Sequence, residues 1–193
     1  MAATISETLK QTMRELALEL PFKKISTSLI CERAHVSRAA FYARFANKEA
    51  LLGAVIAEDI CESVLTIRNT ITTSKFHAST HSLVDEVQCS NILAHAEFYR
   101  RIVDECPELF VDELTKGLVR VNDAVLQDYP LSDDEKEYMS FFYASSHAML
   151  YLKWIRDGMH IDSSTLCNWY FKWATDSWQR ISAELGVKEL EAI

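Results

Sequence analysis

The sequence predicts an all-α protein, with a small helix-turn-helix domain at its amino end and a larger helical domain after it. The 193 residues include only four glycines and three prolines, so few positions interrupt long helices. Apolar residues recur at helical spacing along most of the chain, and no stretch shows the sustained alternation of a β-strand. We therefore expect a small helical domain over residues 1–50 and a larger helical domain over residues 51–193.

The first predicted helix follows Thr4 and ends at Pro21. Thr4 and Glu7 have the spacing of a capping box, in which a hydroxyl and a carboxylate satisfy each other's backbone N–H groups. Proline cannot continue the helix because it lacks an N–H donor. The small core of the first domain is also expected to contain Phe22 and Ile25. The buried stripe of this helix consists of Leu9, Met13, Leu16 and Leu20.

Residues 26–52 form the most informative stretch, because polar cap candidates precede three successive runs of helical periodicity. In the first run Ile30 and Ala34 lie four residues apart, and in the second Phe41 and Phe45 repeat the same spacing. Two short helices joined by a tight turn are therefore expected, followed by the start of a third. A short second helix with small and basic residues at its amino end suits a DNA major groove. The three cap candidates are Ser26, Ser37 and Asn47.

This stretch resembles the amino-terminal domain of the TetR family of bacterial transcriptional regulators. One position departs from the family pattern, because His35 stands in the turn where most relatives carry glycine. We expect a positive φ at this position, which histidine tolerates better than most residues with a side chain. The resemblance implies a dimeric regulator that binds DNA and responds to a ligand, with a DNA-binding domain over residues 1–50 and a ligand-binding and dimerisation domain over residues 51–193. It is carried by Ile30, Ala34, Val36, Ser37, Phe41, Tyr42, Phe45, Lys48, Glu49 and Leu51.

The resemblance, together with helix position, assigns the DNA contacts. Ser37 begins the recognition helix, which is expected to lie in the major groove of double-stranded DNA. Arg38 and Arg44 are the long hydrogen-bonding side chains placed to reach base edges, and a phosphate contact is the alternative for Arg38. Ser28 and Ala39 are expected to add shape or methyl contacts. The positions at which the family holds phosphates carry Ser26, Thr27, Tyr42 and Lys48.

The charge distribution agrees with DNA binding at the amino end, although the whole chain has a formal charge of −8. Residues 1–50 contain eight Lys or Arg against five Glu, a balance of +3. The remainder contains 12 basic residues against 23 acidic ones, a balance of −11. Phosphate attraction is therefore expected at one end of the molecule, although a balance of +3 is also compatible with an ordinary solvated surface.

A long helix is expected from Asn47 to about Ile67, linking the two domains. The polar stretch from Thr72 to Ser82 is predicted to be a loop. It contains His77 and His81, whose spacing would suit a metal pair on a helix. The stretch holds no carboxylate or thiol to complete such a site, so we predict no metal and no cofactor.

The middle of the second domain is predicted to form helices from Leu83 to a break at Cys106-Pro107, and from there to Pro130. Several residues with apolar bodies and polar tips are candidates for a small-molecule pocket. Aromatic residues at helical spacing also suit an ordinary core, and that alternative stays open for each of them. The candidates are Phe98, Tyr99, Tyr143, His147 and Met149.

Two antiparallel helices are predicted at the carboxyl end, one ending at Gly158 and the next capped by Asp162 or Ser163. The first is expected to run through Met139, Phe142, Ser146, Leu150 and Trp154. The last helix has large aromatics on more than one face and so needs cover from two sides. The pair resembles the helices with which TetR-type proteins build a dimeric four-helix bundle. The predicted homodimer interface consists of Trp169, Trp173, Trp178 and Ile181.

The remaining patterns narrow the function class. The five cysteines are scattered without a C-x-x-C pair, and no signal peptide or apolar span is present, so we expect reduced thiols, a cytoplasmic protein and no membrane partner. Phosphate-loop, metalloprotease and serine-hydrolase motifs are absent, so we expect no enzyme. We predict a homodimeric repressor on a palindromic operator, controlled by an unknown small-molecule effector. The alternative is a co-activator or protein-interaction module on the same fold, with weak or no DNA binding.

Overall fold

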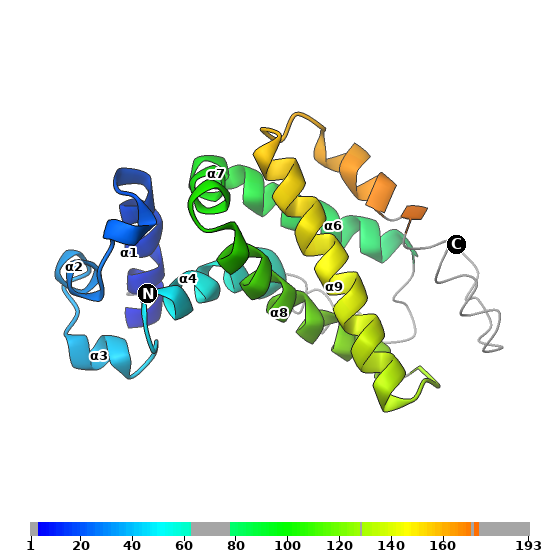
Figure 1. The fold of residues 1–193 in the computed structure, drawn as a ribbon, viewed down its shortest axis with the longest axis horizontal. Coiled ribbons are helices and arrows are strands. Elements are labelled where there is room, and N and C mark those ends of the chain that lie inside the picture. The colour runs from blue at the N-terminus through cyan, green and yellow to red at the C-terminus, as the bar shows by residue number, and fades with distance from the viewer. Residues whose placement is uncertain (1–3, 63–77, 128, 171, 174–193) are drawn as a thin grey trace.

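The structure is a computed structural model that describes residues 4–62, 78–127, 129–170 and 172–173. Every regular element in these ranges is helical, which confirms the all-α class (Figure 1). Within the same ranges, no helix is both long enough and apolar enough to cross a membrane.

The amino-terminal helices form one end of the molecule (Figure 1). The predicted capping box is present, since Thr4 N donates to Glu7 Oε2 at 2.6 Å and Glu7 N donates to Thr4 Oγ1 at 3.2 Å. The predicted small core is confirmed as well, because Phe22 and Ile25 are buried. The elements are α1 (Ile5–Glu19), the 3-10 turn η1 (Phe22–Lys24), α2 (Thr27–Arg33) and α3 (Arg38–Tyr42).

A single long helix was expected next, but the chain forms α4 (Lys48–Ile56) and then the π-helical segment η2 (Ala57–Glu62). Residues 63–67 lie outside the described part. α4 packs against both α1 and α8 (Pro107–Leu126), and the predicted domain boundary at residue 50 falls inside it. The boundary stays a prediction, and one continuous cluster of buried side chains runs through both halves of the chain.

One sequence-based boundary in the middle of the chain was wrong. α6 (Ala78–Ala94) includes residues 78–82, which had been assigned to the loop, and His81 is therefore helical. His77 and residues 72–76 lie outside the described part. The expected helical stretch from Leu83 to Cys106 is divided at His95, after which α7 (Ala96–Glu105) begins. Neither the start of α6 nor the division at His95 coincides with glycine or proline, and tertiary packing readily overrides the weak preferences of Ser, Thr and His.

α9 (Asp133–Arg156) contains the residues through which the first carboxyl-terminal helix was expected to run. Of these residues Trp154 is buried, whereas Phe142 is 64% exposed and Ser146 is exposed. The Ser140 hydroxyl donates to the Val119 carbonyl at 3.2 Å, so the side of α9 that carries Ser140 faces α8. Small residues on that side allow the two helices to approach closely. The buried residues are Ser140, Ala144, His147, Ala148, Tyr151, Leu152, Trp154 and Ile155.

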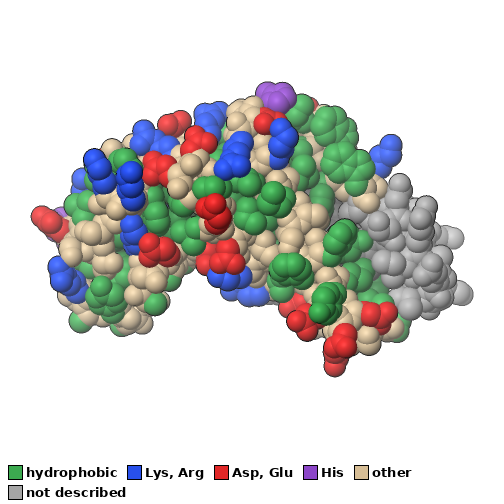
Figure 2. Space-filling view, viewed as in Figure 1, with side chains coloured by type: hydrophobic (Ala, Val, Ile, Leu, Met, Phe, Trp, Pro, Cys, Tyr) green, Lys and Arg blue, Asp and Glu red, His purple; other side chains and the backbone are tan. Residues whose placement is uncertain are grey.

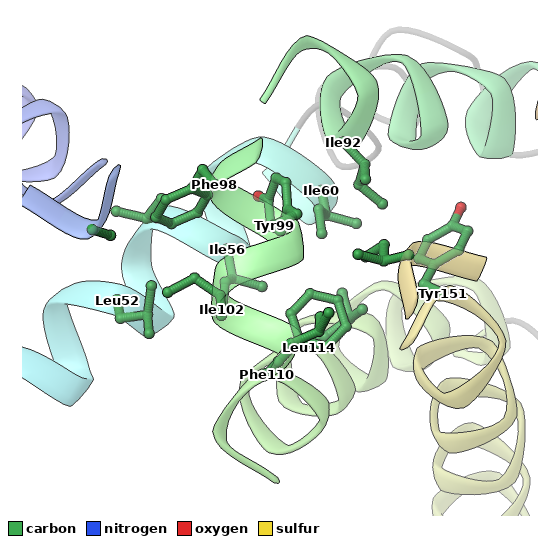
Figure 3. Close-up of a cluster of buried hydrophobic side chains, with 14 of the residues drawn as sticks. Leu52, Ile56, Ile60, Ile92, Phe98, Tyr99, Ile102, Phe110, Leu114 and Tyr151 are labelled. Atoms are coloured by element: carbon green, nitrogen blue, oxygen red, sulfur yellow. The ribbon is translucent and has the colours of Figure 1, made fainter. Parts of the chain in front are cut away.

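The core of the larger part lies where α4, η2, α6, α7, α8 and α9 meet (Figure 3). Tyr99 and Phe110 pack edge to face with ring centroids 6.1 Å apart. Ile60 of η2 lies in the same cluster and is fully buried. The irregular segment is therefore held by apolar packing as well as by its backbone.

The turn after α9 confirms two predictions. Gly158 has φ 81, and the amide of Met159 donates to the Trp154 carbonyl at 2.9 Å, which is a Schellman ending. Asp162 caps the final helix, which begins at residue 163, because its Oδ1 accepts from Thr165 N at 2.9 Å. That helix packs on α9 through the Tyr170 hydroxyl, which donates to a backbone carbonyl of α9 at 3.3 Å.

Candidate nucleic-acid interface

The turn between α2 and α3 depends on the unusual backbone of His35. Its φ is 53, as the sequence had led us to expect. The amide of His35 donates to the Glu32 carbonyl at 3.2 Å, and the amide of Val36 donates to the Cys31 carbonyl at 2.9 Å. These two bonds form the same Schellman ending that glycine usually provides. His35 therefore sets the angle at which α3 leaves α2.

Both short helices begin at a serine cap. Ser26 Oγ accepts from Leu29 N at 3.2 Å, and Ser37 Oγ accepts from Ala40 N at 3.2 Å. The predicted caps are therefore confirmed, and so is the one at Asn47, which accepts from the amide of residue 50. Because the serine hydroxyls already bond within the protein, their first role is to fix the helix ends.

The arginines of the recognition helix make contacts within the protein. Arg38 Nη2 donates to Ser28 Oγ at 2.5 Å, which joins the starts of α2 and α3. Arg44, which follows the end of α3, has its Nη1 donating to the Ala40 carbonyl of α3 at 2.8 Å. Tyr42 is 57% exposed beside the buried ring of Phe41, with ring centroids 5.4 Å apart. The structure thus brings Ser28, Arg38 and Tyr42 to the outside of the motif, where Ala39 is exposed as well.

Lys48 has a structural role that sequence reasoning missed. Its ammonium group donates to the carbonyls of Phe22 and Ile25, at 2.8 and 2.9 Å, and lies 4.4 Å from the centroid of the Phe22 ring. These contacts join the start of α4 to the 3-10 turn before α2. The contact of Lys48 with a DNA phosphate stays a prediction. Lys48 would then both stabilise the domain and bind DNA.

Some basic residues of the first fifty form ion pairs within the protein, and others are exposed to solvent near the motif. Arg33 forms a bidentate pair with Glu19 at 2.8 and 2.9 Å, and its hydrogen bonds lower the pKa of that carboxyl. Lys10 and Arg14 pair with carboxylates of η2. Figure 2 shows the blue side chains spread over this end of the molecule. Besides the paired Arg33, the exposed basic residues close to the motif are Lys23, Lys24, Arg38 and Arg44.

A buried polar cluster connects this end to the rest of the protein, and no sequence pattern had indicated it. Arg14 Nη2 of α1 donates to Asp59 Oδ1 at 2.5 Å, and the Tyr99 hydroxyl of α7 donates to Asp59 Oδ2 at 2.8 Å. Asn91 of α6 donates to the Asp59 backbone carbonyl at 2.6 Å. Burial raises the pKa of the Tyr99 phenol well above its ordinary value, so the phenol stays protonated as a donor. The available signal was the adjacent pair Glu58-Asp59, which follows the apolar run from Leu51 to Ala57 and precedes Ile60.

The predicted ligand residues do not gather around one cavity in the described part of the chain. Phe98 and Tyr99 are buried side by side on α7. His147 is buried on α9 and stacks on Tyr170 with centroids 4.1 Å apart. Met149 is 54% exposed and lies along an open groove of about 490 Å³ between α8 and α9. Two residues along a helix point to nearly opposite sides, which separates Met149 from His147. Tyr143 is half-buried.

Two of the four predicted dimer residues lie in the described part of the chain. Trp169 and Trp173 are 43% and 58% exposed and stack with ring centroids 6.2 Å apart. Trp178 and Ile181 lie outside the described part. Sequence reasoning missed a second exposed apolar surface, which consists of Tyr138, Phe141, Phe142 and Met149 on α9. In Figure 2 hydrophobic side chains gather beside the acidic start of this helix.

Two family models match the chain. Residues 11–55, which include most of α1, all of α2 and α3, and α4 except its last residue, match the model described as bacterial regulatory proteins, tetR family. Residues 88–169 match the model of a transcriptional regulator C-terminal region. The chain belongs to the TetR family of bacterial transcriptional regulators. The resemblance seen in the sequence is thereby confirmed, and no curated protein matches the chain.

Solved structures of TetR-type proteins share the fold. The dihydroxyacetone kinase operon activator DhaS superposes with a TM-score of 0.61 at 18% identity, covering 91% of this chain and 97% of that one. A putative TetR-family regulator from Syntrophomonas wolfei gives 0.58 at 16% identity, with 97% and 98% covered. FadR from Bacillus subtilis, in complex with stearoyl-CoA, gives 0.53 at 16% identity, with 86% and 95% covered. At such identities the likeness extends to the fold alone.

Proposed function

We propose that this TetR-family protein is a sequence-specific DNA-binding repressor that acts as a homodimer and responds to a small-molecule effector. The observation that carries the proposal is the outward surface of the helix-turn-helix motif. There Arg38, Ala39 and Tyr42 are exposed on α3, and Ser28 of α2 bonds to Arg38. A short helix that presents an arginine and a small residue at its amino end suits base contacts in a major groove.

The test of DNA binding uses the purified protein and the DNA upstream of its own gene. Fluorescence anisotropy should show tight binding to a duplex from this region and weaker binding to a scrambled duplex of equal length and composition. Specific sites are typically bound about 10³-fold or more tightly than random DNA at physiological salt. Equal affinity for both duplexes at every salt concentration would contradict sequence-specific binding.

A homodimer would place two recognition helices on one face of the DNA. Their separation should be about 34 to 36 Å, so that they enter successive major grooves of a palindromic operator. The exposed Trp169 and Trp173 support self-association, because large apolar groups in contact with water are usually covered in the working assembly. Footprinting should show two protected half-sites about one helical turn apart.

An effector would act through its differential affinity for two arrangements of the protein. The contact between Tyr99 and Asp59 supports such a connection, because Asp59 also pairs with Arg14 of α1, next to the motif. A ligand that displaced Tyr99 would weaken the support of α1. FadR from Bacillus subtilis, in complex with stearoyl-CoA, is a ligand-bound protein of the same fold.

The proposed ligand role of Tyr143 and His147 can be tested with the variants Tyr143→Phe and His147→Leu. If these residues contact an effector, both variants should keep the fold and the DNA affinity and should alter release from the operator by compounds found in a screen on the wild type. A loss of stability with an unchanged response would assign both residues to the core.

A co-activator or protein-interaction module is the second candidate function. It is favoured by the alanines at positions 39, 40 and 43, which offer no hydrogen bonds to bases, and by Arg44, which bonds to the backbone of α3. The similar fold of the operon activator DhaS also keeps an activating role open. Transcription from the upstream promoter in a purified system separates the candidates, because a repressor lowers transcript yield and an activator raises it.

A further inference from the structure

Two buried cysteines from distant parts of the chain meet in the larger domain. Cys89 Sγ on α6 and Cys167 Sγ on the final helix are 3.7 Å apart, although 78 residues separate them in the sequence. Their exposed fractions are 0% and 2%. All five cysteines lie in the described part, and none takes part in a disulfide. From this geometry we propose that Cys89 and Cys167 form a reversible disulfide when the protein meets hydrogen peroxide.

The two sulfurs are close enough for side-chain rotation to bring them toward bonding distance. A disulfide has sulfurs about 2 Å apart, and rotation about the two Cα–Cβ bonds moves each sulfur by more than the difference from 3.7 Å. The Tyr151 hydroxyl lies 3.8 Å from Cys89 Sγ and donates to Gln88 Oε1 at 2.9 Å. A sulfenic acid at Cys89 would therefore have a hydrogen-bonding neighbour inside the domain.

The chemistry balances with peroxide as the only oxidant. One thiolate sulfur attacks a peroxide oxygen and the O–O bond breaks, which leaves a sulfenic acid and, after protonation, one water. The second sulfur then attacks the sulfenic sulfur, the S–O bond breaks, and a second water leaves. Two thiols and one peroxide thus give a disulfide and two waters. Because both sulfurs are buried, the first step depends on local opening of the final helix.

The bond would join the final helix to α6. It closes a long loop, so it should raise the thermal unfolding midpoint of the oxidised protein by roughly 10 °C. It would also fix the helix that carries Trp169 and Trp173 relative to the rest of the domain. This proposal does not depend on DNA binding or on the oligomeric state.

The experiment treats the full-length folded protein with hydrogen peroxide, removes the excess with catalase and measures intact mass. We expect a loss of two hydrogen atoms, recovery of the mass with dithiothreitol, and a cross-linked Cys89–Cys167 peptide after digestion. Cys106→Ser is the matched control. Cys106 is half-buried, burial raises the pKa of its thiol to about 11, and the variant should form the cross-link as the wild type does.

Cys89→Ala and Cys167→Ala should each abolish the mass loss. The peptide map of the wild type keeps the proposal testable if either variant fails to fold. A cross-link between other cysteines, oxygen added to one cysteine without a cross-link, or an unchanged mass in excess peroxide would each overturn the proposal.

Discussion

The Tyr99 hydroxyl donates a 2.8 Å hydrogen bond to Asp59, the carboxylate that also accepts from Arg14 at 2.5 Å. Asp59 thereby joins α1, next to the DNA-binding motif, to α7 in the larger part. The pair of Arg14 and Asp59 is largely buried, with side-chain exposures of 13% and 7%. Removing one member of a buried ion pair strongly lowers stability, because the other charge is left buried without a partner. While the pair is intact, it holds α1 and η2 in a defined arrangement.

Asp59→Asn should lower the free energy of unfolding by about 3 kcal/mol, because Arg14 would keep its charge without a carboxylate partner. Tyr99→Phe removes one hydrogen bond and should cost about 1 kcal/mol. Urea denaturation followed by circular dichroism measures both. Glu58→Gln is the matched control, since Glu58 pairs with Lys10 and Arg14 at a more exposed site and should cost well under 1 kcal/mol after solvent screening. Equal losses for Glu58→Gln and Asp59→Asn would refute the special role of Asp59.

His35→Gly should stabilise the motif. The left-handed backbone at φ 53 is unfavourable for a residue with a Cβ, and glycine relieves this at some cost in unfolded-state entropy. The expected gain in unfolding free energy is up to about 1 kcal/mol. His35→Ala keeps the Cβ and should give no gain. Thermal denaturation compares the three proteins, and a glycine variant less stable than the wild type would show that the imidazole stabilises the turn.

Arg38→Ala and Lys48→Ala should affect DNA binding in different ways. Loss of Arg38 should cost about 1 to 3 kcal/mol on the preferred duplex and little on a scrambled one, because it removes a base contact. Loss of Lys48 should weaken both complexes alike and reduce the salt slope by about one counterion per subunit. Lys48→Ala should also lower the unfolding midpoint, because Lys48 donates to two carbonyls. Anisotropy at several salt concentrations measures the affinities.

If Arg38→Ala lowered the affinity for both duplexes equally, we would assign Arg38 to a phosphate contact and not to a base contact. Unchanged binding for both variants would favour the protein-interaction alternative. Ser28→Ala is the control for the internal bond, since it removes the partner of Arg38 but leaves the guanidinium in place.

Trp173→Glu should convert the proposed dimer into a monomer. Trp173 is 58% exposed and stacks on Trp169, and a carboxylate placed in an apolar interface would lose its hydration. Sedimentation velocity at micromolar concentration measures the change. Leu18→Glu is the control, because Leu18 on α1 is also exposed, at 41%, and should leave the assembly intact. If the Trp173→Glu variant stays dimeric, we would assign the interface to the exposed face of α9 instead. The variant Phe142→Glu then tests that assignment.

Acid should weaken the start of the final helix. Hydrogen bonds from Ser164, followed by those from Thr165, lower the pKa of Asp162 from 3.8 to about 2. Since the folded pKa is below the unfolded one, the stabilisation is complete above pH 3.8 and is lost as pH falls toward 2. Asp162→Asn keeps an oxygen at the cap but does not titrate. The stability difference between the two proteins should therefore shrink over this pH window in urea denaturation, and a constant difference would contradict the shift.

Local features were predictable from the sequence because their interactions are local. The cap at Thr4, the positive φ of His35 and the end of α9 at Gly158 each depend on residues within five positions. The outward position of Tyr42 follows from helical periodicity once the neighbouring Phe41 is buried. The family resemblance rested on such spacings, and the family models match the same segment.

The tertiary structure alone decided which of two apolar faces of α9 is buried, because packing against α8 selects the side with Ser140 and leaves Phe142 in water. It also brought Asp59 between Arg14 and Tyr99, and Cys89 beside Cys167. These partners lie 40 or more residues apart in the sequence. Periodicity shows that a helix has an apolar face, but which neighbour covers that face depends on how all the helices share one core.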